Sequence, residues 1–455
     1  MSHWANESVF YQIYPLGLCG APAQNDLSSP PANRLDELLP WLDHAHFLGA
    51  NALYIGPIFE SLSHGYDTVN YSVVDRRLGT NDAFARVCAR AHELGLKVVL
   101  DAVFNHVGRG FPGFRDLQEK GRASRYLDWF AGVDFQRASP RGDAFTYEGW
   151  HGHDDLVKLD VRNPAVRDHL FSATAQWMDQ FGIDGLRLDA ADCLDLDFLR
   201  LLGSFCRARR ADFWLLGEII HGDYRRWAAP GLLDSVTNYE CYKGLYSSHA
   251  EQNYFEIAWS LNRQFGPQGL YRGLPLYNFA DNHDVSRVAS LVKDPAQLLP
   301  LYSILFTMPG VPSVYYGSEW GIQATKDATD RNLRPRLSLA DAEGAGTLPG
   351  LEEAIGRLAL IRRASPALLT GDYRQIHVAS LQFAFARWCR EETVIVALNN
   401  DTRAAAFSLD ASPLPDGAMH DLMDPGRAIR VTGGRLSFSL APRSAAVISS
   451  APQGR

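Results

Sequence analysis

The sequence has few of the features that mark secreted, membrane or metal-rich proteins. Its six cysteines occur singly, without the close Cys and His spacing of a zinc site or the density of a disulfide scaffold. No uncharged apolar run approaches the roughly 20 residues that cross a bilayer, and "MSHWANESVFYQIYP" at the start lacks the basic and apolar regions of a signal peptide. We therefore expect free thiols, a soluble cytoplasmic protein and no membrane partner.

Clusters of basic residues are also missing. The net charge is -8, and the lysines and arginines are dispersed, which argues against a nucleic-acid partner because neutralising phosphates needs clustered Lys and Arg. By contrast, 46% of the 455 residues are hydrophobic and 11% are aromatic, enough to bury a substantial core. The composition excludes a disordered chain.

Eight short β-rich apolar runs recur through the first three quarters of the chain. They are "SVFYQIYP" (8–15), "NALYIGPIF" (51–59), "LKVVLDAVF" (96–104), "GLRLDA" (185–190), "FWLLGEII" (213–220), "SVTNYE" (235–240), "LPLYNFA" (274–280) and "PSVYYG" (312–317). Segments of helical periodicity, such as 36–49, 81–95 and 163–182, separate most of them. This alternation predicts a parallel sheet covered on both faces, and eight strands predict a closed (β/α)₈ TIM barrel.

Two regions depart from the alternation. The interval after the third run is too long for an ordinary crossover and predicts a small inserted subdomain at 107–163. From 371 onwards, alternating short strands such as "LQFAFARW" and "TVIVALNN" predict a C-terminal antiparallel β-sandwich domain over 371–455. The barrel then comprises residues 1–106 and 164–370.

Charged residues stand at the ends of several predicted strands. Arg187 and Asp189 are two residues apart and therefore share one face of their strand. Asp101, Glu218 and Asp284 end three other runs. The carboxyl ends of barrel strands form the active site of such folds, so one site could contain them all. The alternative is an ion pair that only closes the barrel.

Several carboxylates around one cleft suit glycoside hydrolysis, in which one acid protonates the leaving oxygen and another attacks or stabilises the sugar. The same cluster could hold Mg²⁺ or, with His106 and His283, form a metal hydrolase. His151 and His153 are a further pair with metal-binding chemistry, although two loop histidines without a third ligand are more often solvated.

Seven motifs, in order, resemble the α-amylase superfamily of glycoside hydrolases. They are "HGYDT" (64–68), "DAVFNH" (101–106), "LVKLDVRNP" (156–164), "GLRLDAA" (185–191), "GEII" (217–220), "FADNHD" (279–284) and "GVPSVYYGSEWG" (310–321). The resemblance implies that Asp189 is the nucleophile, Glu218 the general acid/base and Asp284 the carboxylate that stabilises the sugar at the transition state.

The resemblance also implies the residues that bind the substrate. His106, Arg187 and His283 match positions that hydrogen-bond the sugar, and Tyr66 matches the aromatic platform beneath it, where core packing is the alternative. Asp330 and Arg334 resemble a pair that holds a terminal glucose, although a surface ion pair is the alternative. Asp67 and Asp101 resemble supporting residues that orient the catalytic groups.

Within the family, "LVKLD" and "GEIIH" are most similar to the neopullulanase, cyclomaltodextrinase and maltogenic amylase group. Lys158 stands where calcium-dependent amylases carry an aspartate, so we expect no cofactor and doubt a structural calcium. The N-terminal β domain of that group, through which its members dimerise, is missing from the sequence, so a homodimer is an open alternative.

The resemblance implies a retaining hydrolase of α-1,4 bonds, with α-1,6 bonds as an open option, in maltooligosaccharides or cyclic maltodextrins, with a small α-glucan as its partner. An α-glucan transglycosylase and a sucrose- or trehalose-acting relative share the same carboxylates. A non-catalytic barrel that serves as an interaction protein is a further alternative, but such relatives usually lack one of the three carboxylates.

Overall fold

The computed structural model of the chain describes residues 3–412 and 414–451. Its centre is an eight-stranded parallel sheet whose spatial order is β11-β10-β9-β5-β2-β1-β13-β12. The strands are β1 (Phe10–Ile13), β2 (Ala52–Ile55), β5 (Lys97–Ala102), β9 (Gly185–Leu188), β10 (Trp214–Gly217), β11 (Ser235–Val236), β12 (Tyr277–Phe279) and β13 (Val311–Tyr315). Each of the eight predicted runs contains one strand or most of one. The prediction of a TIM barrel is therefore confirmed.

The barrel closes where the two edge strands of the sheet, β11 and β12, meet. β11 ends the ladder on one side and β12 on the other, and one isolated parallel bridge between Thr237 and Tyr277 joins them. Helices cover the outside: α2 (Leu39–Phe47), α3 (Asn81–Glu93), α5 (Pro164–Phe181), α6 (Leu196–Arg209), α7 (Tyr239–Ala250), α8 (Phe255–Phe265), α10 (Leu298–Thr307) and α12 (Leu351–Ala364). Between β10 and β11, over the fully described segment 218–234, a short 3-10 turn, η6 (Tyr224–Arg226), stands in place of an α-helix.

The sequence explains where the best-defined helices begin and end. The Asn163 side chain accepts a hydrogen bond from the backbone N–H of Ala165, Pro164 occupies the first turn of α5, and Gly182 ends the helix at a φ of 67°. Thr80 caps α3 in the same way, by accepting from the Ala83 N–H. These are the preferred start and stop residues of α-helices.

Alternation along the barrel strands fills the interior with apolar side chains. Every second residue points inward, and these positions form one buried cluster: Phe10, Ala52, Tyr54, Val99, Trp214, Leu216, Tyr277, Phe279 and Val311, together with Ala5. The intervening residues, such as Tyr11 and Leu53, belong to the larger core between sheet and helices. The lower barrel is thus a packed core, and only the upper inward positions remain for polar groups.

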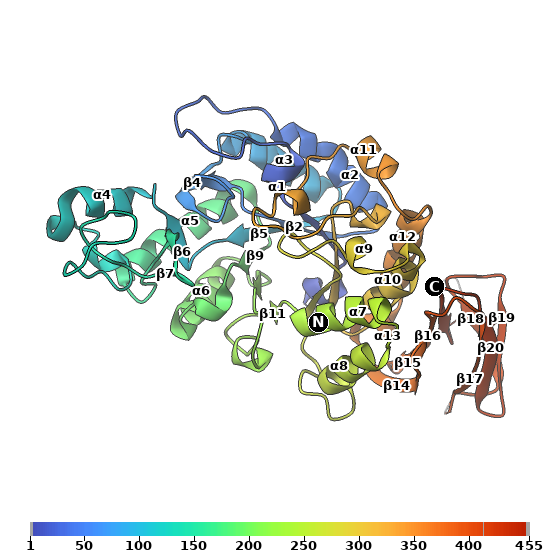
Figure 1. The fold of residues 1–455 in the computed structure, drawn as a ribbon. Coiled ribbons are helices and arrows are strands. Elements are labelled where there is room, and N and C mark those ends of the chain that lie inside the picture. Colours follow the sequence, from blue (N-terminus) through green and yellow to red (C-terminus); the bar gives the residue numbers. More distant parts are fainter. Residues whose placement is uncertain (1–2, 413, 452–455) are drawn as a thin grey trace.

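Residues between β5 and α5 form a small unit at one end of the molecule (Figure 1). Its three-stranded antiparallel sheet has the order β6 (His106–Gly108), β8 (His153–Lys158) and β7 (Gly149–Trp150), and α4 (Pro112–Lys120) packs beside it. A separate hairpin, β3 (Phe59–Ser61) and β4 (Thr68–Val74), precedes α3. The predicted insertion after the third barrel strand therefore contains its own sheet.

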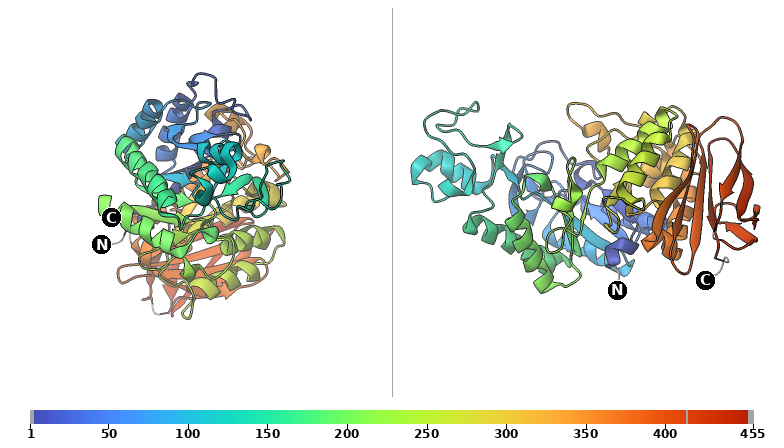
Figure 2. Two further views of the ribbon diagram at one scale, coloured as in Figure 1. Left: turned by 90° about the vertical axis from the view of Figure 1, so that its left-hand side faces the viewer. Right: turned by 90° about the horizontal axis from the view of Figure 1, so that it is seen from below.

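The C-terminal strands form an eight-stranded sheet at the opposite end of the molecule, as the right-hand view of Figure 2 shows. It contains β14 (Asp372–Val378), β15 (Gln382–Trp388), β16 (Thr393–Asn399), β17 (Ala405–Asp410), β18 (Gly417–Asp421), β19 (Ala428–Thr432), β20 (Arg435–Leu440) and β21 (Ser444–Ser449). All its pairings are antiparallel, as predicted. β17 to β20 lie on the side away from the barrel (Figure 1).

Three short helices complete the barrel connections: α1 (Pro15–Leu18), α9 (Val288–Leu291) and α11 (Leu339–Gly344). A fourth, α13 (Pro366–Thr370), leads into β14. Over residues 3–412 and 414–451, no helix is both long and apolar enough to cross a membrane.

Candidate functional site

The polar groups of the barrel mouth occupy the next inward positions above the apolar interior. Gln12 follows Phe10 by two residues, Asp101 follows Val99, and Glu218 follows Leu216. Because the side-chain period of a strand is two, these residues point into the barrel like the apolar residues below them. The carboxyl ends of several strands therefore bring their charges to one place.

Arg187 binds three carboxylates, which together with it we call the carboxylate cluster. Its Nη1 lies 2.8 Å from Asp101 Oδ1 and 2.9 Å from Asp189 Oδ1, and its Nη2 lies 2.7 Å from Glu218 Oε1. The Arg187 side chain is 3% exposed, whereas those of Asp189 and Glu218 are 11% and 12% exposed. Asp189 and Glu218 are thus the members of the cluster that a ligand can reach, and Arg187 fixes them from below.

Burial raises the pKa of both Asp189 and Glu218 above the usual carboxyl range. Arg187 lowers both values, but the remaining carboxylates oppose it: Glu218 and Asp101 raise the pKa of Asp189, and Asp284 raises that of Glu218. One guanidinium cannot neutralise three carboxylates, so burial and the neighbouring negative charges leave the pKa of both Asp189 and Glu218 raised.

The backbone after β9 supports Glu218 directly. Ala190 has a φ of 45°, in the left-handed region that residues other than glycine seldom adopt. In this conformation its N–H donates to Glu218 Oε2 at 3.1 Å. The backbone turn that follows Asp189 therefore also orients the Glu218 carboxyl.

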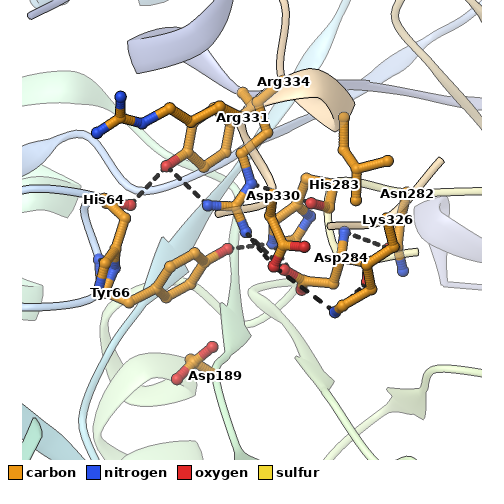
Figure 3. Close-up of polar contacts among 12 residues, drawn as sticks. His64, Tyr66, Asp189, Asn282, His283, Asp284, Lys326, Asp330, Arg331 and Arg334 are labelled. Carbon is orange, nitrogen blue, oxygen red and sulfur yellow. Dashed lines mark hydrogen bonds and ion pairs between the residues drawn. The ribbon is translucent and has the colours of Figure 1, made fainter. Parts of the chain in front are cut away.

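Asp284 belongs to a second group of charges on the other side of the mouth (Figure 3). Its Oδ2 lies 2.9 Å from His283 Nε2 and its Oδ1 lies 2.7 Å from Arg334 Nη2. Burial alone would raise the pKa of Asp284, but His283 and Arg334 outweigh it and hold that pKa far below its usual value. Asp284 therefore favours its ionised form.

Tyr66 joins the two groups. Its hydroxyl donates to Asp101 Oδ2 at 3.0 Å and also contacts His283 Nε2, while its ring stacks on that of His283 at a centroid distance of 5.6 Å. In Figure 3 the tyrosine side chain extends from the His64 side towards His283 and Asp284, with Asp189 nearby. The ring is 8% exposed, so its position fits both a wall of the site and the core packing considered above.

Arg334 and Asp330 lie at this end of the site rather than at an open surface. The Arg334 guanidinium is 10% exposed and lies 4.6 Å from the centre of the Tyr14 ring. Asp330 Oδ2 is 4.0 Å from Arg334 Nη2 and 3.6 Å from Lys326 Nζ, and Lys326 also donates to the Asp284 carbonyl at 2.7 Å. The loop 326–334 therefore closes the Asp284 side of the mouth.

His106 faces Asp189 from the insertion. Its Nε2 is buried, has no hydrogen-bond partner within the described chain and lies 3.8 Å from Asp189 Oδ2. Burial lowers its pKa to about 3, so the imidazole is neutral. Trp150 packs against it with 5.8 Å between ring centres. A neutral nitrogen held beside the cluster suits a sugar hydroxyl.

Asp67 does not touch the carboxylate cluster. Its carboxylate accepts from the N–H and hydroxyl of Ser63, at 3.1 and 2.6 Å, and so fixes the loop that carries Tyr66. Asp101, by contrast, contacts Arg187, Tyr66 and Tyr54 directly. The two residues predicted to support the site therefore act at different distances from it.

Sequence reasoning missed four residues that contact the site. Gln12 binds His283 Nδ1 at 2.8 Å, Tyr54 donates to Asp101 at 2.8 Å, Tyr239 lies 3.5 Å from Glu218 Oε1, and Lys326 contacts Asp284. Gln12 and Tyr54 could have been found by continuing the inward alternation along their strands. Tyr239 and Lys326 carry no such signal, because a helix start and a loop present them.

The cleft around Asn105, where the resemblance would place a calcium ion, contains the cation Lys158. Lys158 Nζ lies 3.0 Å from Glu148 Oε2, both residues line one cleft with Asn105, and the Asn105 amide contacts His106 Nδ1 at 3.1 Å. The Lys158 ammonium adds a positive charge to this cleft, whose lining also includes Asp128, Asp160, Asp192 and Asp195. Among the described residues, no group of three or more His, Cys, Asp or Glu side chains is arranged to hold a metal ion.

Comparison with known proteins agrees with this geometry. Residues 35–347 match the model of the alpha-amylase catalytic domain. Neopullulanase 2 from Thermoactinomyces vulgaris is 32% identical over 96% of this chain and 77% of that protein, and a cyclomaltodextrinase from a Bacillus species is 29% identical over 88% and 73%. The solved structure of cyclic α-maltosyl-(1→6)-maltose hydrolase from Arthrobacter globiformis superposes with a TM-score of 0.81 at 27% identity, covering 99% of this chain and 100% of that one. The chain therefore belongs to the alpha-amylase family and is a glycoside hydrolase.

Proposed function

We propose that the protein hydrolyses α-glucosidic bonds in maltooligosaccharides and cyclic maltodextrins with retention of the anomeric configuration. The observation that carries the proposal is the carboxylate cluster, in which two reachable carboxyls, Asp189 and Glu218, bind one buried guanidinium. A double displacement needs this arrangement: one group attacks as a carboxylate while the other donates a proton.

The proposed steps assign one role to each carboxyl. The Asp189 carboxylate attacks the anomeric carbon, the glycosidic C–O bond breaks, and the Glu218 carboxyl protonates the leaving oxygen. The Glu218 carboxylate then deprotonates a water molecule, which attacks the same carbon and releases Asp189. Asp284, held ionised by His283 and Arg334, stabilises the positive charge that develops on the sugar ring.

The substrate class rests on the relatives. Their names describe enzymes that act on cyclomaltodextrins, on pullulan and on a cyclic maltosyl-maltose with α-1,6 bonds. We therefore propose small linear or cyclic α-glucans with α-1,4 bonds as substrates. The similarity to the Arthrobacter hydrolase, which superposes over its whole length, supports α-1,6 bonds as a second target of this protein.

Product analysis of wild-type protein and the Asp189→Asn variant tests the proposal. Incubation with maltotriose, a cyclodextrin, pullulan and starch is expected to give glucose and maltose from the first two and slow conversion of starch. Proton NMR of the first turnovers should detect the α-anomer, and Asp189→Asn should fold normally yet lose nearly all turnover. A β-anomer as first product, or turnover by Asp189→Asn close to wild type, would contradict the proposed roles.

A further inference from the structure

An aromatic groove lies between the loop after β10 and the helices α7 and α8. We call it the α7–α8 groove, with a volume of about 940 Å³, within the range of about 300–1,000 Å³ typical of ligand cavities. Its apolar walls include Ile220, Tyr239, Tyr242, Phe255 and Trp259. Tyr239 also contacts Glu218, so the groove and the carboxylate cluster share a wall.

The far part of the groove presents aromatic rings to solvent. Trp259 is 61% exposed and Phe255 is 50% exposed, and Ile220 near the mouth is 43% exposed. Large exposed apolar side chains that gather in one concavity mark a binding site rather than ordinary surface. Phe255 and Trp259 belong to α8 and Ile220 to the loop after β10, and all three line the same cavity.

Charged side chains beside the rings give the groove a polar component. Arg263 lies 5.6 Å from the centre of the Trp259 ring and pairs with Glu240. The guanidinium restrains the indole, and the ion pair offers a donor and an acceptor beside an apolar face. A glucose ring has this combination, with C–H groups on its face and hydroxyl groups around its edge, and therefore fits such a wall.

The two ends of the catalytic site differ. Arg334, Asp284 and the loop 326–334 close one end, as described above. At the other end, Tyr239 contacts Glu218 and also lines the α7–α8 groove. A substrate that extends past Glu218 on this side would therefore meet the groove.

We infer that the α7–α8 groove binds the glucosyl units on the leaving-group side of the scissile bond, with Trp259 as a stacking platform for a unit remote from the cleavage point. The inference rests on the proposed function, because the leaving group lies on the side of the acid that protonates it, Glu218. The groove then sets how strongly the enzyme favours long substrates over short ones.

The test compares two substrates in three proteins. For wild type, Trp259→Ala and Trp259→Phe, kcat/KM is measured with maltotriose and with maltoheptaose. In Trp259→Ala the ratio of kcat/KM for maltoheptaose to kcat/KM for maltotriose should fall about fivefold, which is the effect expected from the loss of one aromatic contact. In Trp259→Phe most of the wild-type ratio should be retained. Phe47→Ala is the matched control, because Phe47 is an 82% exposed aromatic outside the groove.

A binding measurement distinguishes an error in the role of the groove from an error in the proposed function. Maltoheptaose is titrated calorimetrically into the Asp189→Asn protein and into Asp189→Asn/Trp259→Ala, where the second should bind about fivefold more weakly for the same reason. If Trp259→Ala changes neither the ratio of the two kcat/KM values nor the affinity for maltoheptaose, the groove does not bind substrate, and the proposed hydrolysis is unaffected. A Trp259→Ala protein whose sedimentation mass drops from dimer to monomer would also overturn it, by assigning the face to a second subunit. Absence of wild-type hydrolysis on either substrate would instead overturn the proposed function.

Discussion

The charge of Arg187 matters because it compensates carboxylates from three different strands. Replacement by methionine keeps the bulk of the side chain but leaves three buried carboxyls without their cation. Breaking a buried ion pair in this way costs about 3–5 kcal/mol. We expect Arg187→Met to lower the free energy of unfolding at pH 7 by about this amount.

The loss of unfolding free energy in Arg187→Met should be larger at pH 7 than at pH 5. The folded-state pKa values of Asp189 and Glu218 are already raised, and removing Arg187 raises them further. A carboxyl with a raised folded pKa stabilises the fold below its unfolded pKa and loses that stabilisation as the pH rises through the folded value. Urea unfolding should therefore show a smaller deficit at pH 5 than at pH 7. The control Arg200→Met, at an exposed pair with Asp197, should change little at either pH.

The raised pKa of Glu218 also predicts the pH dependence of activity. A general acid must be protonated, so the higher pKa extends activity to more alkaline pH than an ordinary glutamic acid would allow. The alkaline limb of kcat/KM for maltotriose should fall above the usual carboxyl range. With α-maltosyl fluoride, whose leaving group needs no proton, that limb should shift or vanish. Glu218→Gln should lose about 10²–10⁴-fold on maltotriose and far less on the fluoride, and equal losses on both would contradict its role.

At the scale of elements, the turn after β9 couples the fold to the site. Ala190 tolerates a φ of 45° because its side chain is a single methyl group, whereas a β-branched side chain would be strained there by about 1–3 kcal/mol. We expect Ala190→Val to lower both stability and kcat, because the N–H that binds Glu218 would move. Ala190→Gly should keep both within a small factor. Thermal unfolding and kcat of the two variants check this, and equal effects would exclude a conformational cause.

The barrel elements could be predicted because their sequence signal is local. Apolar runs gave each strand to within a few residues, and the charges of Asp101, Arg187 and Glu218 lie where the inward alternation ends. What could not be predicted depends on tertiary placement. Tyr239 reaches Glu218 from the first residue of α7, and Lys326 reaches Asp284 from a loop more than forty residues away. No periodicity in the sequence relates either pair.

The barrel and the C-terminal sheet share one apolar core. Leu305 of α10 and Tyr373, Phe385, Val396 and Val447 of the C-terminal strands belong to the same buried cluster. Arg387 of β15, itself buried, donates to the Thr307 carbonyl of α10 at 2.8 Å. Parts that share a large apolar interface unfold together rather than in turn.

We therefore expect one calorimetric unfolding transition, with activity lost in the same interval. Phe385→Ala, at the shared core, should lower the stability of the entire molecule by about 3–5 kcal/mol without splitting the transition. Phe47→Ala, at an exposed site on α2, should leave the transition temperature almost unchanged. Two resolved transitions in either variant would show that barrel and sheet are independent.

The single bridge between Thr237 and Tyr277 makes the junction of β11 and β12 the seam of the barrel. Side-chain amides reinforce the seam where the backbone ladder is short: Asn238 binds Gln264 at 3.0 Å and Asn278 at 2.8 Å. A closure that relies on amides rather than on a ladder opens at lower cost, so hydrogen exchange should be faster there than in β2 or β5. Because α7 starts at this seam, sugar bound along the helix would slow that exchange and act as a latch on the barrel.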